Sequence, residues 1–89
     1  MTYTVTWKPE VERELTAIWN ESTDQQAIAD AADLLDRELR KHAHSVGESR
    51  PDDVRIAFER PLGIRFRVLQ QDRQVSVIAV WRTDRRTRA

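Results

Sequence analysis

The chain has 89 residues, of which 39% are hydrophobic and 34% charged, and it contains no cysteine. A chain of this length builds one small domain, and the lack of cysteine excludes both a disulfide framework and a thiolate metal site. No apolar run approaches the roughly 18 residues of a membrane span and the first residues lack a signal peptide's pattern, so we expect a soluble, cytoplasmic protein.

The formal net charge is zero, but the charges are unevenly distributed along the chain. Residues 1–44 carry nine acidic and five basic residues, whereas residues 45–89 carry six acidic and ten basic ones. Thirteen of the basic residues are arginine, which suits bidentate contacts to phosphate or carboxylate. A G+C-rich genome would produce the same bias without any function behind it, and composition does not separate these explanations.

The chain begins with a strand and a helical hairpin. Residues 2–7, TYTVTW, alternate as in a half-buried strand, and Pro9 then begins a helix predicted over residues 9–21. A second helix runs from an N-cap at Thr23, with Gln26 three places on in the capping-box position, to about His44. Because only about three residues join the two helices, they must form an antiparallel hairpin.

Three further strands follow the connector SVGESRPDD, residues 45–53. In the first of them, VRIAFER, the alternation predicts that Val54, Ile56 and Phe58 face the core and that Arg55 faces solvent. Residues 61–69 and 74–82 then form a hairpin around QQDR. The strand VRIAFER is expected to be an unpaired edge, open to strand addition by a partner.

The hairpin register follows from the apolar pattern. An even loop pairs Val68 with Val75, Phe66 with Val77, Ile64 with Ala79 and Leu62 with Trp81, which makes one face wholly apolar. Arg65, Arg67 and Arg82 then share the face that points away from the helices. Trp7, Trp19 and Trp81 all fall at positions predicted to face the core.

The order strand, helix, helix, strand, strand, strand predicts an α+β domain. A helical hairpin packs on one face of a mainly antiparallel four-stranded sheet, over residues 1–82. Residues 83–89, TDRRTRA, have no apolar anchor and form a basic tail.

This order resembles the RelE/ParE superfamily of toxins from type II toxin-antitoxin modules. YTVTWKPEVERELTAIW is similar to the family's first strand and helix, VGESRPDDVRIAFERPLGIRFRV to its connector and middle strands, and VSVIAVWRTDRR to its last strand and the arginines beyond. The resemblance implies one of two activities, ribosome-dependent cleavage of mRNA or poisoning of DNA gyrase. It also implies an antitoxin that wraps the toxin and forms an assembly with it.

The resemblance also implies functional residues. The family's third-strand arginine corresponds to Arg65 or Arg67, its connector arginine to Arg50, and the arginine after its last strand to Arg82, Arg85 or Arg86. RelE-like nucleases typically add lysines, or a glutamate and a histidine, and often a tyrosine near the C-terminus. Residues 45–89 of this chain hold neither lysine nor histidine, and the one tyrosine is Tyr3.

The residues themselves suggest an anion-binding face. Arg55, Arg65, Arg67 and Arg82 could bind phosphate, or could simply keep an exposed sheet face soluble. Arginine stays protonated and is a poor general base, so the acids that could be nominated for that role are Glu48 and Glu59, without support from spacing. No metal site or cofactor is expected, because His42 and His44 point to different sides of a helix and no glycine-rich phosphate loop is present.

These observations favour a toxin that acts as a stoichiometric binder and is held inactive by an antitoxin. An mRNA endoribonuclease in which the arginines hold the scissile phosphate is the first alternative. A gyrase-binding inhibitor or an inactive protein of the same fold is the second.

Overall fold

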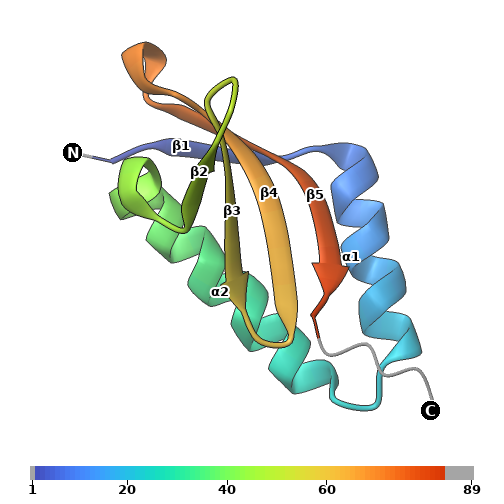
Figure 1. Cartoon of the computed structure of the whole chain (residues 1–89). Helices are drawn as coiled ribbons and strands as arrows, with labels where there is room; N and C mark the ends of the chain where they lie inside the picture. Colours follow the sequence, from blue (N-terminus) through green and yellow to red (C-terminus); the bar gives the residue numbers. More distant parts are fainter. Residues whose placement is uncertain (1, 84–89) are drawn as a thin grey trace.

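A computed structural model describes residues 2–83 of the chain. Two helices lie against one face of a five-stranded sheet (Figure 1). In chain order the elements are β1 (Thr4–Trp7), α1 (Pro9–Glu21), α2 (Gln25–His42), the 3-10 turn η1 (Ala43–Ser45), β2 (Glu48–Arg50), β3 (Val54–Glu59), β4 (Leu62–Leu69), the 3-10 turn η2 (Gln70–Asp72) and β5 (Gln74–Arg82). The predicted α+β class and helical hairpin are confirmed. Within the described part of the chain, neither helix combines the length and hydropathy that a bilayer-spanning segment needs.

The sheet contains one strand more than the four predicted. Its order is β1-β5-β4-β3-β2, with β1 parallel to β5 and all other neighbours antiparallel. The additional strand, β2, lies in the connector that was predicted as a loop, and it pairs with β3. The prediction that β3 is an unpaired edge is therefore wrong for residues 54–56, which β2 covers, whereas residues 57–59 pair with no strand on that side within the described chain.

Gly47 and Arg55 explain why the connector reaches β3. Gly47 has a φ of 71°, and a side chain there would overlap the backbone carbonyl of Ile56, so only glycine permits this close approach. The Arg55 guanidinium donates hydrogen bonds to the backbone oxygens of Val46 (2.7 Å) and Gly47 (2.9 Å). One arginine thus fastens the start of the connector to the sheet.

The helices begin as their first turns dictate. Pro9 occupies the first turn of α1, as predicted, and Glu10 and Glu12 follow it, where the helix dipole favours acidic side chains. The capping box predicted at Thr23 is wrong: α2 begins at Gln25, and Asp24 stands at the N-cap without a side-chain capping hydrogen bond. The Gln26 amide instead donates to Asp30, one turn further along the helix (2.9 Å).

The hairpin of β4 and β5 follows the predicted register only near its loop. Val68 lies opposite Val75, Arg67 opposite Ser76 and Phe66 opposite Val77, as predicted. An irregularity between Arg65 and Phe66 then leaves Ile78 as an extra residue in β5, and the remaining pairs are Arg65–Ala79, Ile64–Val80, Gly63–Trp81 and Leu62–Arg82. Such a bulge reverses which side each later residue faces. Trp81 therefore points away from the helices and Arg82 toward them, opposite to the prediction.

The facing of β3 is also reversed. Residues that pair across antiparallel strands point to the same side, and Ala57 lies opposite Ile64 while Phe58 lies opposite Gly63. Ala57 is buried, whereas Phe58 is 60% exposed. The alternation was read correctly, but its phase is set by pairing with β4, and the small Ala57 is the residue that packs inward.

The prediction that all three tryptophans face the core is wrong for two of them. Trp7 packs at the margin of the core, and its indole donates a hydrogen bond to Asp36 of α2 (3.0 Å). Trp19 on α1 is 41% exposed. Trp81 lies on the far side of the sheet, so only the prediction for Trp7 agrees with the structure.

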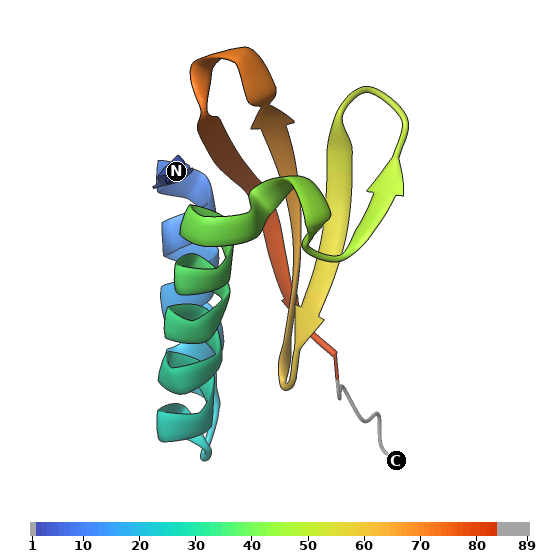
Figure 2. The same ribbon diagram turned by 90° about the vertical axis from the view of Figure 1, so that its left-hand side faces the viewer.

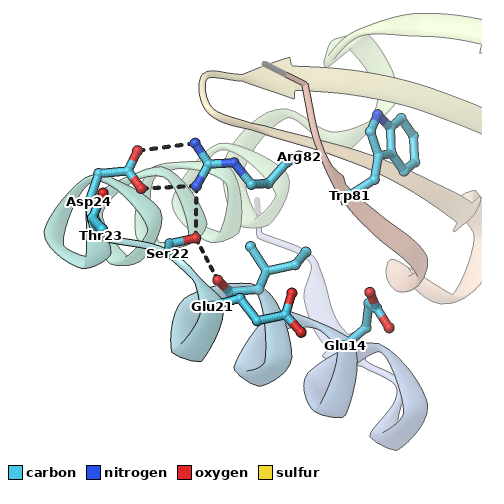
Figure 3. A pocket seen from close by; sticks show the side chains of 8 residues that line it. Glu14, Glu21, Ser22, Thr23, Asp24, Trp81 and Arg82 are labelled. Atoms are coloured by element: carbon cyan, nitrogen blue, oxygen red, sulfur yellow. Dashed lines mark hydrogen bonds and ion pairs between the residues drawn. The ribbon is translucent and has the colours of Figure 1, made fainter. Parts of the chain in front are cut away.

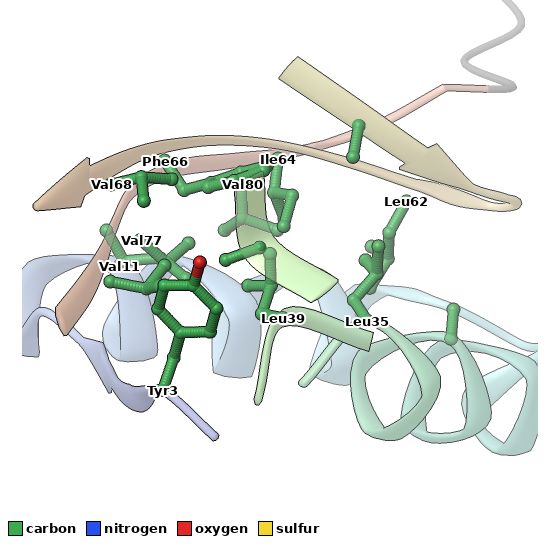
Figure 4. Packing of buried hydrophobic residues seen from close by; sticks show 14 of the residues in the cluster. Tyr3, Val11, Leu35, Leu39, Leu62, Ile64, Phe66, Val68, Val77 and Val80 are labelled. Atoms are coloured by element: carbon green, nitrogen blue, oxygen red, sulfur yellow. The ribbon is translucent and has the colours of Figure 1, made fainter. Parts of the chain in front are cut away.

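The core lies between the helices and the sheet, and Figure 4 shows side chains of α2 and β4 meeting there. Its largest fully buried side chains are Phe66, Ile28, Leu39, Leu62, Ile64, Val75 and Val77. Because both helices lie on one side, the other side of the sheet is left uncovered (Figure 2). We call this side the open face, and by register it carries Glu48, Arg50, Val54, Ile56, Phe58, Gly63, Arg65, Arg67, Leu69, Gln74, Ser76, Ala79, Trp81, Thr4 and Thr6.

Candidate functional site on the open face

Arg65 and Arg67 stand on β4, the central strand of the sheet, and both are exposed on the open face. Neither makes a hydrogen bond or an ion pair with any of residues 2–83. Arg65 lies between Ile56 and Ala79, so its neighbours across the sheet are apolar. Two guanidinium groups on an uncovered sheet, without acidic partners in the described chain, make this surface a candidate anion-binding site.

Arg50 extends this surface at the edge of the sheet. It lies opposite Val54, which in turn lies opposite Arg67, so the backbones of the two arginines are about 10 Å apart. Arg50 donates to Glu48 (3.2 Å), but the two side chains are 43% and 75% exposed. Ion pairs as exposed as this contribute at most about 1 kcal/mol, so an anionic ligand can compete for Arg50.

Arg55 does not belong to the open face. It lies opposite Phe66, on the side of the sheet that faces the helices, and its guanidinium is taken by the carbonyls of Val46 and Gly47. The prediction that Arg55 faces solvent beside the other arginines is wrong. Its role is to hold the connector in place.

Arg82 is likewise turned away from the open face. Its guanidinium forms a two-pronged ion pair with Asp24, at 2.9 and 3.1 Å, and donates to the hydroxyl of Ser22 at 2.8 Å (Figure 3). These hydrogen bonds hold the pKa of Asp24 below its ordinary value of 3.8. The end of β5 is therefore fastened to the link between the two helices.

The surroundings of Arg82 are acidic. It lines an open hollow of about 640 Å³ together with Glu14, Glu21 and Asp24 (Figure 3). Three carboxylates around one guanidinium repel a phosphate group. Arg82 thus lies apart from Arg65 and Arg67, although the predicted register places all three on one face.

The remaining predicted site residues lie apart from Arg65 and Arg67. Glu48 is on the open face but bonded to Arg50, and Glu59 lies opposite Leu62 on the side that faces the helices. Arg85 and Arg86 lie outside the described residues.

Comparison by sequence gives no match to any protein-family model or curated protein. Comparison of structures does. A chain of the toxin-antitoxin complex RelBE2 from Mycobacterium tuberculosis has a TM-score of 0.74 at 16% identity, over 92% of this chain and 99% of that one. A chain of the chromosomal ParDE system from P. aeruginosa has a TM-score of 0.68 at 20% identity, over 93% and 98%. The E. coli toxin RelE, as a mutant in the free state, has a TM-score of 0.68 at 16% identity, over 94% and 86%.

The chain has the RelE/ParE toxin fold. A fold of this kind does not fix the chemistry, which must be argued from the residues of the site.

Proton-transfer groups are scarce on the open face of this RelE/ParE fold. Among its described residues the only titratable group besides the arginines is Glu48. Tyr3 is buried on the other side of the sheet, where its hydroxyl lies 3.1 Å from His44 Nδ1 and donates to Gln70 (3.0 Å). No group of residues that could hold a metal ion occurs between positions 2 and 83. In its described part, the open face thus combines three arginines with a single carboxylate.

Sequence reasoning missed two residues of the open face. Phe58 and Trp81 were both assigned to the core, yet they contact each other on the open face with ring centroids 6.2 Å apart. The signal that could have located them is Gly63, which lies between them in the sheet and leaves room for a large ring on that side.

Proposed function

We propose that this chain is the toxin of a type II toxin-antitoxin module, that it inhibits growth by binding an anionic target, and that a cognate antitoxin neutralises it. Structural similarity to chains of the RelBE2 and ParDE systems supports the assignment to such a module. The observation that carries the proposal is the pair Arg65 and Arg67, exposed on the uncovered side of the sheet without partners among residues 2–83.

Binding without cleavage is the form of this proposal that the residues support best. Arginine can stabilise charge on a phosphate, but it remains protonated and cannot accept a proton. Among the described residues of the open face, the one carboxylate is Glu48, and it is already hydrogen-bonded to Arg50. Cleavage of mRNA would need a proton acceptor from the ribosome or from the substrate.

Induced expression in a bacterial host tests the proposal. We expect strong induction to arrest growth, and the double variant Arg65→Ala/Arg67→Ala to relieve the arrest at equal protein level. The matched control is Arg13→Ala/Arg37→Ala, which removes the same charge from exposed positions on α1 and α2. This control should remain as toxic as the wild type, and co-expression of the product of an adjacent antitoxin reading frame should restore growth.

Two results would overturn the proposal. Unchanged growth despite accumulation of the folded wild-type chain would exclude a toxin. Codon-linked cuts in transcripts, mapped by primer extension and lost in Arg65→Ala, would replace the binder with a nuclease.

A further inference from the structure

Three residues form a row across the open face: Phe58 on β3, Gly63 on β4 and Trp81 on β5. A Cβ atom built on Gly63 would come within 2.7 Å of the Trp81 indole, so the ring occupies the space that a side chain would fill. Phe58 meets Trp81 in a T-shaped contact, with the ring planes at 78°. Glycine therefore provides the space in which the two aromatic rings meet.

Phe58 is held on the surface rather than buried. Its side chain is 60% exposed, the largest value among the exposed large hydrophobic residues of the described chain, although it lies opposite Gly63 of the central strand β4. A phenylalanine this exposed adds little to folding, and large exposed apolar groups commonly mark interaction sites. The contact with Trp81 restricts the rotamers of Phe58. Part of the side-chain entropy that Phe58 would lose on binding a ligand is therefore already lost in the free protein.

Positive charge lies directly beside this aromatic pair. Arg65 is two residues from Gly63 on the same side of β4, and Arg67 is two residues further. Arg50 stands at the edge of the same face, next to its partner Glu48. The combination of an exposed aromatic ring with a line of cations fits a polyanion that also carries flat apolar groups.

We propose that Phe58 and Trp81 form a stacking site for a base of single-stranded nucleic acid whose phosphates are held by Arg65 and Arg67. This inference rests on the proposed function and narrows its anionic target. An acidic protein segment would also satisfy the arginines and could pack apolar side chains on the rings. A single-stranded nucleic acid supplies a phosphate and a flat base in every residue, which matches arginines and aromatic rings side by side. RNA and DNA share the required chemistry.

Fluorescence anisotropy with labelled eight-nucleotide strands tests the stacking site. The probes are single-stranded RNA, single-stranded DNA and an abasic strand of the same length, which keeps the phosphates and lacks the bases. We expect Phe58→Ala to weaken binding of a base-containing strand about 5- to 100-fold, the loss for removing one base–aromatic stack, and to leave the abasic strand unaffected. Arg65→Ala should weaken all three, and the difference between RNA and DNA identifies the natural ligand.

Two controls keep the result independent of folding. Phe58→Leu retains an apolar side chain of similar size without a π face, and it should bind as weakly as Phe58→Ala with an unchanged circular dichroism spectrum. Trp19→Ala removes another exposed aromatic residue, from α1 on the opposite side of the molecule, and should bind like the wild type. A base-containing strand should also quench tryptophan emission in the wild type but not in Trp81→Phe.

Equal binding of all strands by the wild type and Phe58→Ala would overturn the inference. So would a wild type that ignores every strand but binds an acidic peptide, which would assign the open face to a protein. Neither result touches the proposed function if induced growth arrest still depends on Arg65 and Arg67, so the two failures are distinguishable.

Discussion

The Asp24 carboxylate can accept hydrogen bonds either from its own helix or from another part of the chain. At an N-cap, such a side chain usually accepts a hydrogen bond from a backbone N–H of its own helix. Here it binds Arg82 of β5 instead, 58 residues away in sequence, and α2 begins without a side-chain cap. A local capping interaction is thus exchanged for one that ties the last strand to the helical hairpin.

The pH dependence of stability should report this ion pair. Because the pKa of Asp24 is lower in the folded chain, the pair stabilises the fold above about pH 3.8 and this contribution is lost as the pH falls through the folded value. We expect Asp24→Asn to unfold at a lower urea concentration than the wild type at pH 7. The difference should shrink as the pH is lowered below about 4.

Asparagine caps a helix as well as aspartate does, so this substitution removes the charge and keeps the local geometry. Asp33→Asn is the matched control, since Asp33 is exposed on the same helix and no hydrogen bond or ion pair involves it within residues 2–83. A gap between the wild type and Asp24→Asn that stays constant from pH 7 to pH 3 would contradict the ion-pair account.

At the scale of elements, β2 depends on a residue of its neighbour. This strand has three residues, all exposed, so its own side chains bury little apolar surface. What fastens it are its pairing with β3 and the two carbonyl contacts of Arg55. The connector should therefore be the part of the sheet that opens most readily.

Removal of the Arg55 guanidinium should loosen β2 selectively. We expect Arg55→Ala to lower the free energy of unfolding by about 1.5–3 kcal/mol, the range for hydrogen bonds to charged groups, and to accelerate hydrogen exchange in β2 and β3. Arg65→Ala is the control: it removes an exposed arginine from the adjoining strand and should change stability by no more than about 0.5 kcal/mol. Uniform acceleration over all strands in Arg55→Ala would count against a local tether.

Periodicity located most elements but not the side that each one shows. The bounds of α1 and β5 agree with the sequence prediction because their apolar patterns are long. In β3 both sides contain apolar residues. Alternation shows which residues share a side but not which side is buried, so the pattern could not show that Ala57 is buried and Phe58 is exposed. β2 has no apolar pattern to detect. For the candidate site, the alternation pattern assigned Arg65 and Arg67 to the correct side of the sheet and Arg55 and Arg82 to the wrong side.

At the scale of the whole molecule, the two layers carry opposite charge. The two helices and β1 fall within residues 1–44, with nine acidic and five basic residues, whereas β2 to β5 come from the arginine-rich remainder. A net charge of zero therefore conceals an acidic helical layer and a basic sheet. Ligand binding should depend on the charge of the face and not on that of the chain.

The salt dependence of nucleic-acid binding should measure that local charge. Each phosphate contact to a single strand contributes about −0.7 to the slope of log K against log salt, so three contacts from Arg50, Arg65 and Arg67 predict a slope of about −2. Arg67→Ala should reduce it to about −1.4, and Arg37→Ala on α2 should leave it unchanged. A slope near zero, or one that Arg67→Ala does not alter, would show that these arginines do not hold phosphates.

The extra residue Ile78 gives the fold a simple means of changing its surface. Because it reverses the parity of β5, the two residues at the end of that strand exchange sides: the indole of Trp81 turns to the open face and the guanidinium of Arg82 to the helices. Insertion or deletion of one residue in β5 would thus change which side chains the open face carries. Val75 and Val77, between the bulge and the hairpin loop, would keep their partners. Chains with one architecture and little sequence in common could in this way diverge in what they bind.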